Sequence, residues 1–165
     1  MLDTRLQNQT QSFLDEFGAA LETGDINAVV EMFQDECYWR DLVSFTWNIK
    51  TMEGRDQVST MLEKQLARIK PSNWQIAEHE LPTEDGGVVT AWITFETSVS
   101  RGFGLLRLKD GKIWTLLTTM VELKGHEEPK GFDRPLGAKH GAGKNRTTWL
   151  EERQREESEL GYKTQ

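Results

Sequence analysis

The second half of the chain carries the pattern that most limits its fold, a series of β-type stretches separated by turn residues. Apolar and other side chains alternate through residues 89–99, which is the period of a β-strand. Asp110-Gly111 stands between two further stretches, residues 103–108 and 113–123, and this dipeptide is a strong signal for a tight hairpin. These residues predict three or four long antiparallel strands.

The first part of the chain has the period of amphipathic helices instead. Apolar residues recur at helical spacing through residues 6–21, and Gly24 follows them as a helix C-cap should. Asp25 is then placed to cap a second helix, whose apolar residues include Phe33. The sequence therefore predicts a tight helical hairpin.

A strand and a third helix are expected between the helical hairpin and the long strands. Residues 38–49 are rich in aromatic and β-branched side chains, which favour a strand. Asp56 is expected to cap a third helix that Pro71 ends, and residues 74–81 predict another strand. This order predicts an α+β fold, a cone-shaped curved antiparallel sheet packed by three N-terminal helices.

The composition changes in the last quarter of the chain. Residues 124–147 are rich in glycine, proline and charge and poor in apolar groups, which is typical of an extended arm. Thr148 and Glu151 have the spacing of a capping box, so a short charged helix is expected to begin there. We therefore predict a domain of residues 1–123 and a linker-like segment of residues 124–165.

Charge and hydropathy restrict the partners and the location. The net charge is -7, and an acidic body repels phosphate backbones, so nucleic acid is not an expected partner. No apolar run approaches the roughly 20 residues of a membrane-spanning helix. The N-terminus also lacks the apolar core of a signal peptide. We therefore expect no membrane partner and a cytoplasmic location.

No motif points to a metal or to a nucleotide cofactor. Cys37 is the single cysteine, which excludes an internal disulfide framework. No cluster of His, Cys, Asp or Glu has metal-ligand spacing. No Gly-x-Gly-x-x-Gly turn follows a predicted strand, so FAD and NAD are not expected in this chain. We therefore expect this chain to bind no cofactor.

Three short motifs resemble the nuclear-transport-factor-2-like (SnoaL-like) superfamily. They are Phe-Gly-Ala-Ala-Leu-Glu-Thr-Gly-Asp-Ile at residues 17–26, Met-Phe-Gln-Asp-Glu-Cys at residues 32–37, and Gly-Arg-Asp at residues 54–56. That superfamily includes ketosteroid isomerases, scytalone dehydratase, SnoaL-type cyclases and many ligand-binding modules. The resemblance covers about residues 10–123 and implies a cone that holds an apolar pocket.

The resemblance also implies which residues line the pocket. Leu116, Thr118 and Met120 match positions that line the cavity in the resembled superfamily. Five further aromatic or flexible side chains are candidate walls: Phe17, Trp39, Trp47, Met61 and Trp92. The competing interpretation is that these residues simply fill the core. The implied partner is a small apolar or aromatic molecule.

Asp41 is the candidate general base. It aligns with the position of the base aspartate in ketosteroid isomerases, and aromatic neighbours such as Trp39 and Phe45 would strengthen a carboxylate as a base. His79 is a candidate catalytic partner, because dehydratases and cyclases of the superfamily often pair a histidine with an aspartate. The plainer interpretation is that Asp41 pairs with a surface cation such as Arg40 and that His79 is structural.

Two departures argue against steroid isomerisation. Phe17 stands where the isomerases have a tyrosine oxyanion donor, and Gly104 lies near the position of their protonated aspartate. Each missing donor typically lowers the rate by about a hundredfold or more. The alternative enzymatic hypothesis is therefore a cofactor-free isomerase, dehydratase or polyketide-cyclase-like enzyme that uses Asp41.

The end of the chain has a second resemblance. Residues 122–128, 134–137, 148–150 and 159–162 resemble the segment that joins such a domain to a flavin-containing monooxygenase domain. This implies an accessory or assembly domain that binds a small apolar ligand, either excised from such a protein or related to one. A third hypothesis is a homodimer formed through the sheet, because residues 88–99 are apolar or aromatic on both faces.

Overall fold

The computed structural model describes residues 2–134 and 147–159. Contacts divide the chain into two units, Met1–Glu128 and Pro129–Gln165, and each is described by itself. The helices of the first unit are α1 (Leu2–Thr23), α2 (Ile26–Glu31) and α3 (Gly54–Ile69). Its strands are β1 (Phe33–Leu42), β2 (Ile49–Glu53), β3 (Ser72–Ile76), β4 (Thr83–Asp85), β5 (Val88–Glu96), β6 (Ser100–Lys109) and β7 (Lys112–Leu123).

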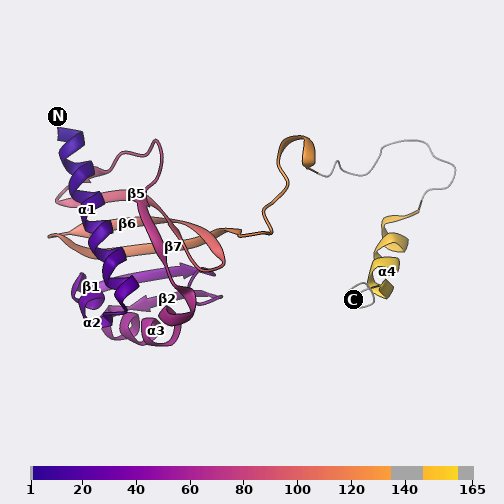
Figure 1. Ribbon diagram of the computed structural model, residues 1–165, viewed down its shortest axis with the longest axis horizontal. Helices are drawn as coiled ribbons and strands as arrows, with labels where there is room; N and C mark the ends of the chain where they lie inside the picture. Colours follow the sequence, from indigo (N-terminus) through magenta and orange to yellow (C-terminus); the bar gives the residue numbers. More distant parts are fainter. Residues whose placement is uncertain (1, 135–146, 160–165) are drawn as a thin grey trace. The chain divides into compact units, whose positions relative to one another are not determined.

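The strands of the first unit form a single mixed sheet in the order β2-β1-β7-β6-β5-β3, with β4 paired to β5. All pairings are antiparallel except that of β1 with β7, which is parallel. Helix α1 contacts β3 and helix α3 contacts β1. Figure 1 shows α1, α2 and α3 together with the sheet. This curved sheet with helices against it confirms the predicted α+β fold class.

The helical hairpin forms as the sequence predicts. Gly24 has a φ of +73°, and the Asp25 N–H donates to the Ala20 carbonyl oxygen at 3.2 Å, the arrangement of a glycine-terminated helix end. The Asp25 carboxylate accepts from the Ala28 N–H at 3.0 Å and caps α2. The assignment of Phe33 to this helix is wrong, because Phe33 is the first residue of β1.

Several other element boundaries differ from the predicted ones. Strand β5 ends at Glu96 rather than at residue 99, and β6 spans Ser100–Lys109 rather than residues 103–108. Residues 38–49 are not one strand: β1 ends at Leu42, and a loop of residues 43–48 leads to β2. Helix α3 begins at Gly54, with Glu53 rather than Asp56 at the capping position. The strand expected at 74–81 ends at Ile76. Two of these boundaries coincide with a backbone of positive φ, at Val43 directly after β1 and at Gly54, the first residue of α3.

The predicted hairpin between β6 and β7 is confirmed. Asp110 and Gly111 have φ angles of +51° and +74°, as a type I′ turn requires. Adjacent register pairs such as Leu106 with Leu116 then continue along the two strands. The hairpin thereby fixes which residues of β7 face the helices.

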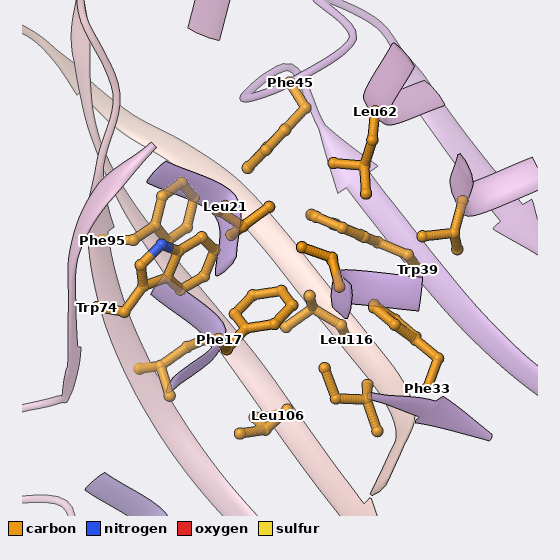
Figure 2. Close-up of a cluster of buried hydrophobic side chains, with 14 of the residues drawn as sticks. Phe17, Leu21, Phe33, Trp39, Phe45, Leu62, Trp74, Phe95, Leu106 and Leu116 are labelled. Carbon is orange, nitrogen blue, oxygen red and sulfur yellow. The ribbon is translucent and has the colours of Figure 1, made fainter. Parts of the chain in front are cut away.

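Aromatic side chains fill the space between the helices and the sheet (Figure 2). They come from α1, β1, the loop of residues 43–48, β3 and β5: Phe17, Phe33, Trp39, Phe45, Trp74 and Phe95. Two glycines make room for them. A Cβ on Gly18 would lie 3.0 Å from Trp74 Cδ1, and one on Gly102 would lie 2.2 Å from Phe95 Cζ. Gly18 on α1 and Gly102 on β6 thus leave room for the rings of Trp74 and Phe95.

The second unit contains a 3-10 helix, Gly131–Asp133, and α4, Trp149–Glu159. The predicted capping box is present, because the Glu151 carboxylate accepts from the Thr148 N–H at 2.8 Å and the Thr148 hydroxyl accepts from the Glu151 N–H at 3.3 Å. The Thr148 N–H and the Thr148 hydroxyl, which both donate to the Glu151 carboxylate, lower the pKa of Glu151 below its usual value. Within the described residues, the helices are too short or too polar to cross a bilayer.

Candidate functional site

Asp41 lies at the end of β1 with its side chain fully buried. Its Oδ2 atom accepts hydrogen bonds from the Phe45 N–H at 3.0 Å, the Thr46 N–H at 2.8 Å and the Thr46 hydroxyl at 2.9 Å. Its Oδ1 atom accepts from the Thr118 hydroxyl at 2.7 Å. The carboxylate therefore joins the loop of residues 43–48 to β7.

A second donor extends this network into the aromatic cluster. The Trp39 indole N–H donates to the Thr118 hydroxyl oxygen at 2.9 Å, and Thr118 in turn donates to Asp41. Both Trp39 and Thr118 are fully buried. Parallel pairing of β1 with β7 brings Asp41 opposite Thr118, which is why these two side chains meet. Three of the predicted site residues thus form one hydrogen-bonded chain.

The loop of residues 43–48 is the irregular segment that this network fixes. Val43 and Trp47 have φ angles of +58° and +54°, a region that costs a β-branched or bulky residue conformational energy. The Val43 N–H donates to the Asn48 carbonyl oxygen at 3.1 Å and closes the loop. Between these two residues the Phe45 ring points into the cluster, where it is fully buried.

His79 lies away from Asp41. It is exposed, with a φ of +63°, in the turn that follows β3. Strand β3 is at one edge of the sheet, and β5, β6 and β7 separate it from β1. The predicted catalytic pairing of Asp41 with His79 would therefore need a rearrangement of the sheet.

The structure brings five of the eight predicted pocket residues to the inner side of the sheet. They are all buried: Phe17, Trp39, Met61, Leu116 and Thr118. Phe17 packs against Trp39 and Trp74 with ring centroids 6.2 and 5.1 Å apart. The space that these residues enclose is occupied by Phe45, Trp74 and Phe95 (Figure 2). The predicted lining residues are therefore part of a filled core in this structure.

The other three predicted pocket residues lie elsewhere. Trp47 is 49% exposed on the loop of residues 43–48, and Met120 is half-buried on β7. Trp92 is 38% exposed on the outer side of β5, where it stacks on Phe103 with ring centroids 5.3 Å apart. Inner residues of β5 such as Ile93 alternate with these outer ones, so Trp92 cannot reach the helices.

An open apolar groove lies between α3 and the α1–α2 turn. Its volume is about 580 Å³. The side chains of Leu21, Ile26, Leu62 and Leu66 supply its apolar floor, and Glu22, Glu63 and Lys70 stand at its edge. We call this hollow the helix groove; its lining is Leu21, Glu22, Thr23, Gly24, Ile26, Leu62, Glu63, Leu66, Ala67, Lys70, Pro71 and Ser72.

A second groove, of about 520 Å³, lies on the other side of α3 beside the loop of residues 43–48. We call it the loop groove; its lining is Thr46, Asn48, Lys50, Met52, Gln57, Thr60, Met61, Lys64 and Gln65. Amides, hydroxyls and two lysines dominate this lining, while Met52 and Met61 form a buried floor. Asp41 lines neither groove.

Two motif residues have structural contacts. Arg55 donates from its guanidinium to the Phe33 carbonyl oxygen and pairs with Asp35 at 3.2 Å, which ties the start of α3 to β1. Burial raises the pKa of the Cys37 thiol above its usual value, and this keeps the thiol protonated near neutral pH. Among residues 2–134 and 147–159, no group of three or more His, Cys, Asp or Glu side chains is arranged to hold a metal ion.

The positions of the missing oxyanion donors are closed. Phe17 is buried among aromatic rings. A Cβ on Gly104 would lie 2.1 Å from the Leu117 carbonyl oxygen, so no side chain fits there without a backbone shift. This geometry agrees with the sequence argument against steroid isomerisation.

Comparisons with known proteins agree with this architecture. A family model described as a SnoaL-like domain matches residues 14–116, more than half of the chain. The chain belongs to the SnoaL-like domain family. No curated protein matches its sequence.

Three solved structures resemble this SnoaL-like domain. A cystatin-like domain from Nostoc punctiforme has a TM-score of 0.56 at 13% identity and covers 72% of this chain and 78% of its own. The orange carotenoid protein of Anabaena (Nostoc) with canthaxanthin has a TM-score of 0.54 at 11% identity. That match covers 67% of this chain but only 36% of the carotenoid protein. A computationally designed 17-OHP binder has a TM-score of 0.51 at 13% identity and covers 65% and 86% of the two chains. These similarities show the fold alone.

Sequence reasoning missed the two grooves and the role of Phe45. The helix groove depends on how α3 packs beside the α1–α2 turn, which no short-range pattern reveals. The sequence predicts a strand at Phe45, because its neighbours are aromatic or β-branched. One local signal was available: Ser44, Thr46 and Asn48 around Phe45 are residues that favour turns more than strand interiors.

Proposed function

We propose that this SnoaL-like domain binds a small apolar molecule in the helix groove. The observation that carries the proposal is an open hollow of about 580 Å³ with an apolar floor and a charged edge. Ligand sites typically have volumes of about 300–1,000 Å³ and mostly apolar linings with a few polar groups. Leu21, Leu62 and Leu66 would exclude water from the ligand, while Glu63 and Lys70 would orient a polar substituent.

The similar structures support a ligand-binding function. The orange carotenoid protein binds canthaxanthin, and the designed protein is a 17-OHP binder. Both have the architecture of this chain, in which helices pack on a curved sheet. The fold is therefore compatible with apolar ligands, and the groove gives this chain a place to hold one.

Fluorescence of the apolar probe N-phenyl-1-naphthylamine tests the proposal. Ala67 is exposed and lines the helix groove, so Ala67→Trp should fill the groove without disturbing the core. We expect this variant to bind the probe about tenfold more weakly, which corresponds to about 1.4 kcal/mol. Ala28→Trp, at an exposed position of α2 outside the lining, is the matched control and should bind as the natural chain does. Equal binding by both variants would contradict the groove as the site.

We also propose that the outer side of the sheet pairs with a second copy of the chain. Trp92 and Phe103 stack there, and Val121 on β7 is 61% exposed. Exposed apolar surface on an open sheet is a common dimer contact. Trp92→Glu should convert a dimer into a monomer in sedimentation, whereas Leu81→Glu in the turn before β4 should not. A natural chain that sediments as a monomer at micromolar concentration would end this proposal.

The enzymatic alternative and the link to a flavin monooxygenase remain predictions. Asp41 has a buried carboxylate, as the enzymatic hypothesis requires, but its oxygens accept four hydrogen bonds from the protein. A base needs a free acceptor position within reach of its substrate. Unchanged turnover of a substrate by Asp41→Asn would remove Asp41 from catalysis. Co-purification with a flavin monooxygenase domain would support the accessory role.

A further inference from the structure

The loop groove is a surface hollow at the edge of the sheet, apart from the aromatic cluster. Its walls are α3 on one side and β2 with the loop of residues 43–48 on the other. Strand β2 is an edge strand, and α3 contacts it. None of the aromatic residues of the cluster lines this groove, and neither do Leu116, Thr118 and Met120, which match cavity positions of the resembled superfamily. The groove is therefore a different place from the cavity that the resemblance implies.

Three side-chain amides in this lining have their oxygen atoms engaged. Asn48 Oδ1 accepts from the backbone N–H of the next residue at 2.8 Å, and Gln57 Oε1 accepts from the Glu53 N–H at 3.1 Å. Gln65 Oε1 accepts from the Arg68 guanidinium at 2.8 Å. An amide held by its oxygen presents its NH2 group to further partners, and an NH2 group only donates. Within the described residues these three NH2 groups have no acceptor.

Lys50 on β2 and Lys64 on α3 add a positive charge to each wall. Both side chains are exposed, and neither forms an ion pair with another residue of ranges 2–134 and 147–159. Lys50 lies opposite Asp41 in the pairing of β1 with β2. The Asp41 oxygens already accept four hydrogen bonds from the loop and from β7, so Asp41 does not hold this lysine in an ion pair.

The lining of the loop groove contains no carboxylate, although the chain as a whole has a net charge of -7. The helix groove, by contrast, has Glu22 and Glu63 at its edge. Cations and hydrogen-bond donors gathered without a carboxylate stabilise a bound anion. Met52 and Met61, which form the buried floor, offer a flexible apolar surface beneath them. The groove therefore suits a molecule that has both an acidic group and an apolar part.

We propose that the loop groove binds a small organic anion, a carboxylate or sulfonate group carried on an apolar body. The acidic group lies between Lys50 and Lys64 and accepts hydrogen bonds from the side-chain NH2 groups beside them. The body packs on Met52 and Met61. This site goes beyond the helix groove, where we propose that an apolar molecule binds, and it does not depend on that proposal.

Two fluorescent probes with the same aromatic skeleton test the proposal. 8-Anilinonaphthalene-1-sulfonate carries a sulfonate, and N-phenyl-1-naphthylamine lacks it. Titration of the full chain gives the affinity for each probe. We expect 1-naphthoate to displace the sulfonate probe, and the uncharged 1-naphthalenemethanol to displace it far more weakly. Raising the salt concentration from about 0.05 to about 0.5 M should weaken binding of the sulfonate probe alone, because salt screens exposed charges.

Two substitutions in the lining test the charge and the donors separately. Lys64→Gln removes one positive charge and should weaken the sulfonate probe about fivefold, the order expected for one exposed charge pair. Lys109→Gln, at an exposed position outside both grooves, makes the same change of net charge and should have no effect. Gln65→Glu keeps the shape and an oxygen for Arg68 but replaces the NH2 group by a second carboxylate oxygen.

Gln65→Glu should weaken the sulfonate probe about tenfold, because like charges then meet in the groove. Gln9→Glu, at an exposed position of α1, is its matched control and should bind as the natural chain does. Both substitutions in the lining should leave the affinity for N-phenyl-1-naphthylamine unchanged. The sulfonate probe is therefore expected to respond to α3 residues that the uncharged probe does not detect.

Ala67→Trp separates the two grooves. It should weaken N-phenyl-1-naphthylamine and leave the sulfonate probe bound. Loss of the sulfonate probe in Ala67→Trp but not in Lys64→Gln would overturn the loop-groove site. Equal weakening by Lys64→Gln and Lys109→Gln would show a response to net charge alone and would also overturn it, as would a natural chain that binds no sulfonate probe. Amine binding that Ala67→Trp leaves intact would contradict only the helix groove.

Discussion

The two sides of α3 show how one helix can border two hollows of different chemistry. Toward the α1–α2 turn, Leu62, Leu66 and Ala67 face an apolar groove. Toward the loop of residues 43–48, the helix presents Met61 and Lys64 to a polar groove of similar volume. These two sets follow the spacing of residues on opposite faces of a helix. The shape of the helix groove depends on side-chain packing. The conformation of the loop of residues 43–48 depends instead on hydrogen bonds to the Asp41 carboxylate.

This difference predicts different responses to mutation and to ligands. Packing tolerates a change of shape at a cost that depends on the volume lost. A buried hydrogen-bond network instead fails as a unit when its central acceptor is removed, because several donors become unsatisfied together. The loop of residues 43–48 should therefore respond more strongly to mutation than the helix groove does. We expect the loop to leave its conformation as a unit rather than to shift slightly. The following measurements test this comparison.

Asp41→Ala should have the largest effect. It leaves the Phe45 and Thr46 amides and the Thr118 hydroxyl without their acceptor, so we expect a loss of about 3–5 kcal/mol in the free energy of unfolding. Urea denaturation followed by tryptophan fluorescence measures it. Asp41→Asn, which retains the shape and one acceptor oxygen, should lose less. Equal losses from both substitutions would show that volume, rather than hydrogen bonding, supports the loop.

Leu66→Ala should have the next largest effect and acts on the other side of α3. Leu66 is 7% exposed, and its truncation should cost about 2–3 kcal/mol and enlarge the helix groove. Urea denaturation gives the stability, and binding of N-phenyl-1-naphthylamine gives the change in the groove. We expect the exchange of the Phe45 and Thr46 amides to stay as in the natural chain. Faster exchange there would show that the two sides of α3 are coupled.

Thr46→Val should cost about 1–2 kcal/mol in the free energy of unfolding, because the Thr46 hydroxyl donates to Asp41 Oδ2 and accepts from the Asn48 N–H. The side chain is half-buried, so no large cavity forms. The loss of stability should be confined to the loop of residues 43–48 and should leave β1 intact. Cys37 on β1 tests this, because burial raises the pKa of its thiol. The rate of alkylation of Cys37 at pH 8 should therefore stay as slow as in the natural chain. Rapid alkylation would indicate that β1 itself opens.

Loss of the Arg101–Glu127 pair should have the smallest effect on either groove. The hydrogen bond from Arg101 lowers the pKa of Glu127 from its usual value of 4.5 to about 2. Its contribution to stability is thus present above pH 4.5 and is lost as the pH falls toward 2. NMR titration of the Glu127 carboxyl carbon checks this shift. Arg101→Gln should remove this shift, and at pH 7 it should leave probe binding unchanged, because neither groove includes the Arg101–Glu127 pair.

The sequence predicted the parts of the fold that depend on local periodicity. The Asp110-Gly111 hairpin was predictable because it needs only two residues of positive φ. The inward direction of Leu116 and Thr118 was implied by the resemblance, and both residues lie on the buried face of β7. The contacts of Asp41 were not predictable, because Thr118 is distant in sequence and meets it only through the parallel pairing of β1 and β7. The burial of Phe45 also depended on that pairing, since the loop is held by the same carboxylate.

The parallel pairing of β1 with β7 has a consequence for the order of events during synthesis. One of the two partners of β1 is the last strand, so a nascent chain that ends before Lys112 has no β7 to join β1 to the rest of the sheet. Contacts so distant in sequence form late, because a long stretch of chain must first be brought together. Until then the aromatic residues of β1 are uncovered on the ribosome. Folding of this domain should therefore finish only after its last strand has emerged, and a ribosome stalled before residue 112 should expose a chaperone-binding chain.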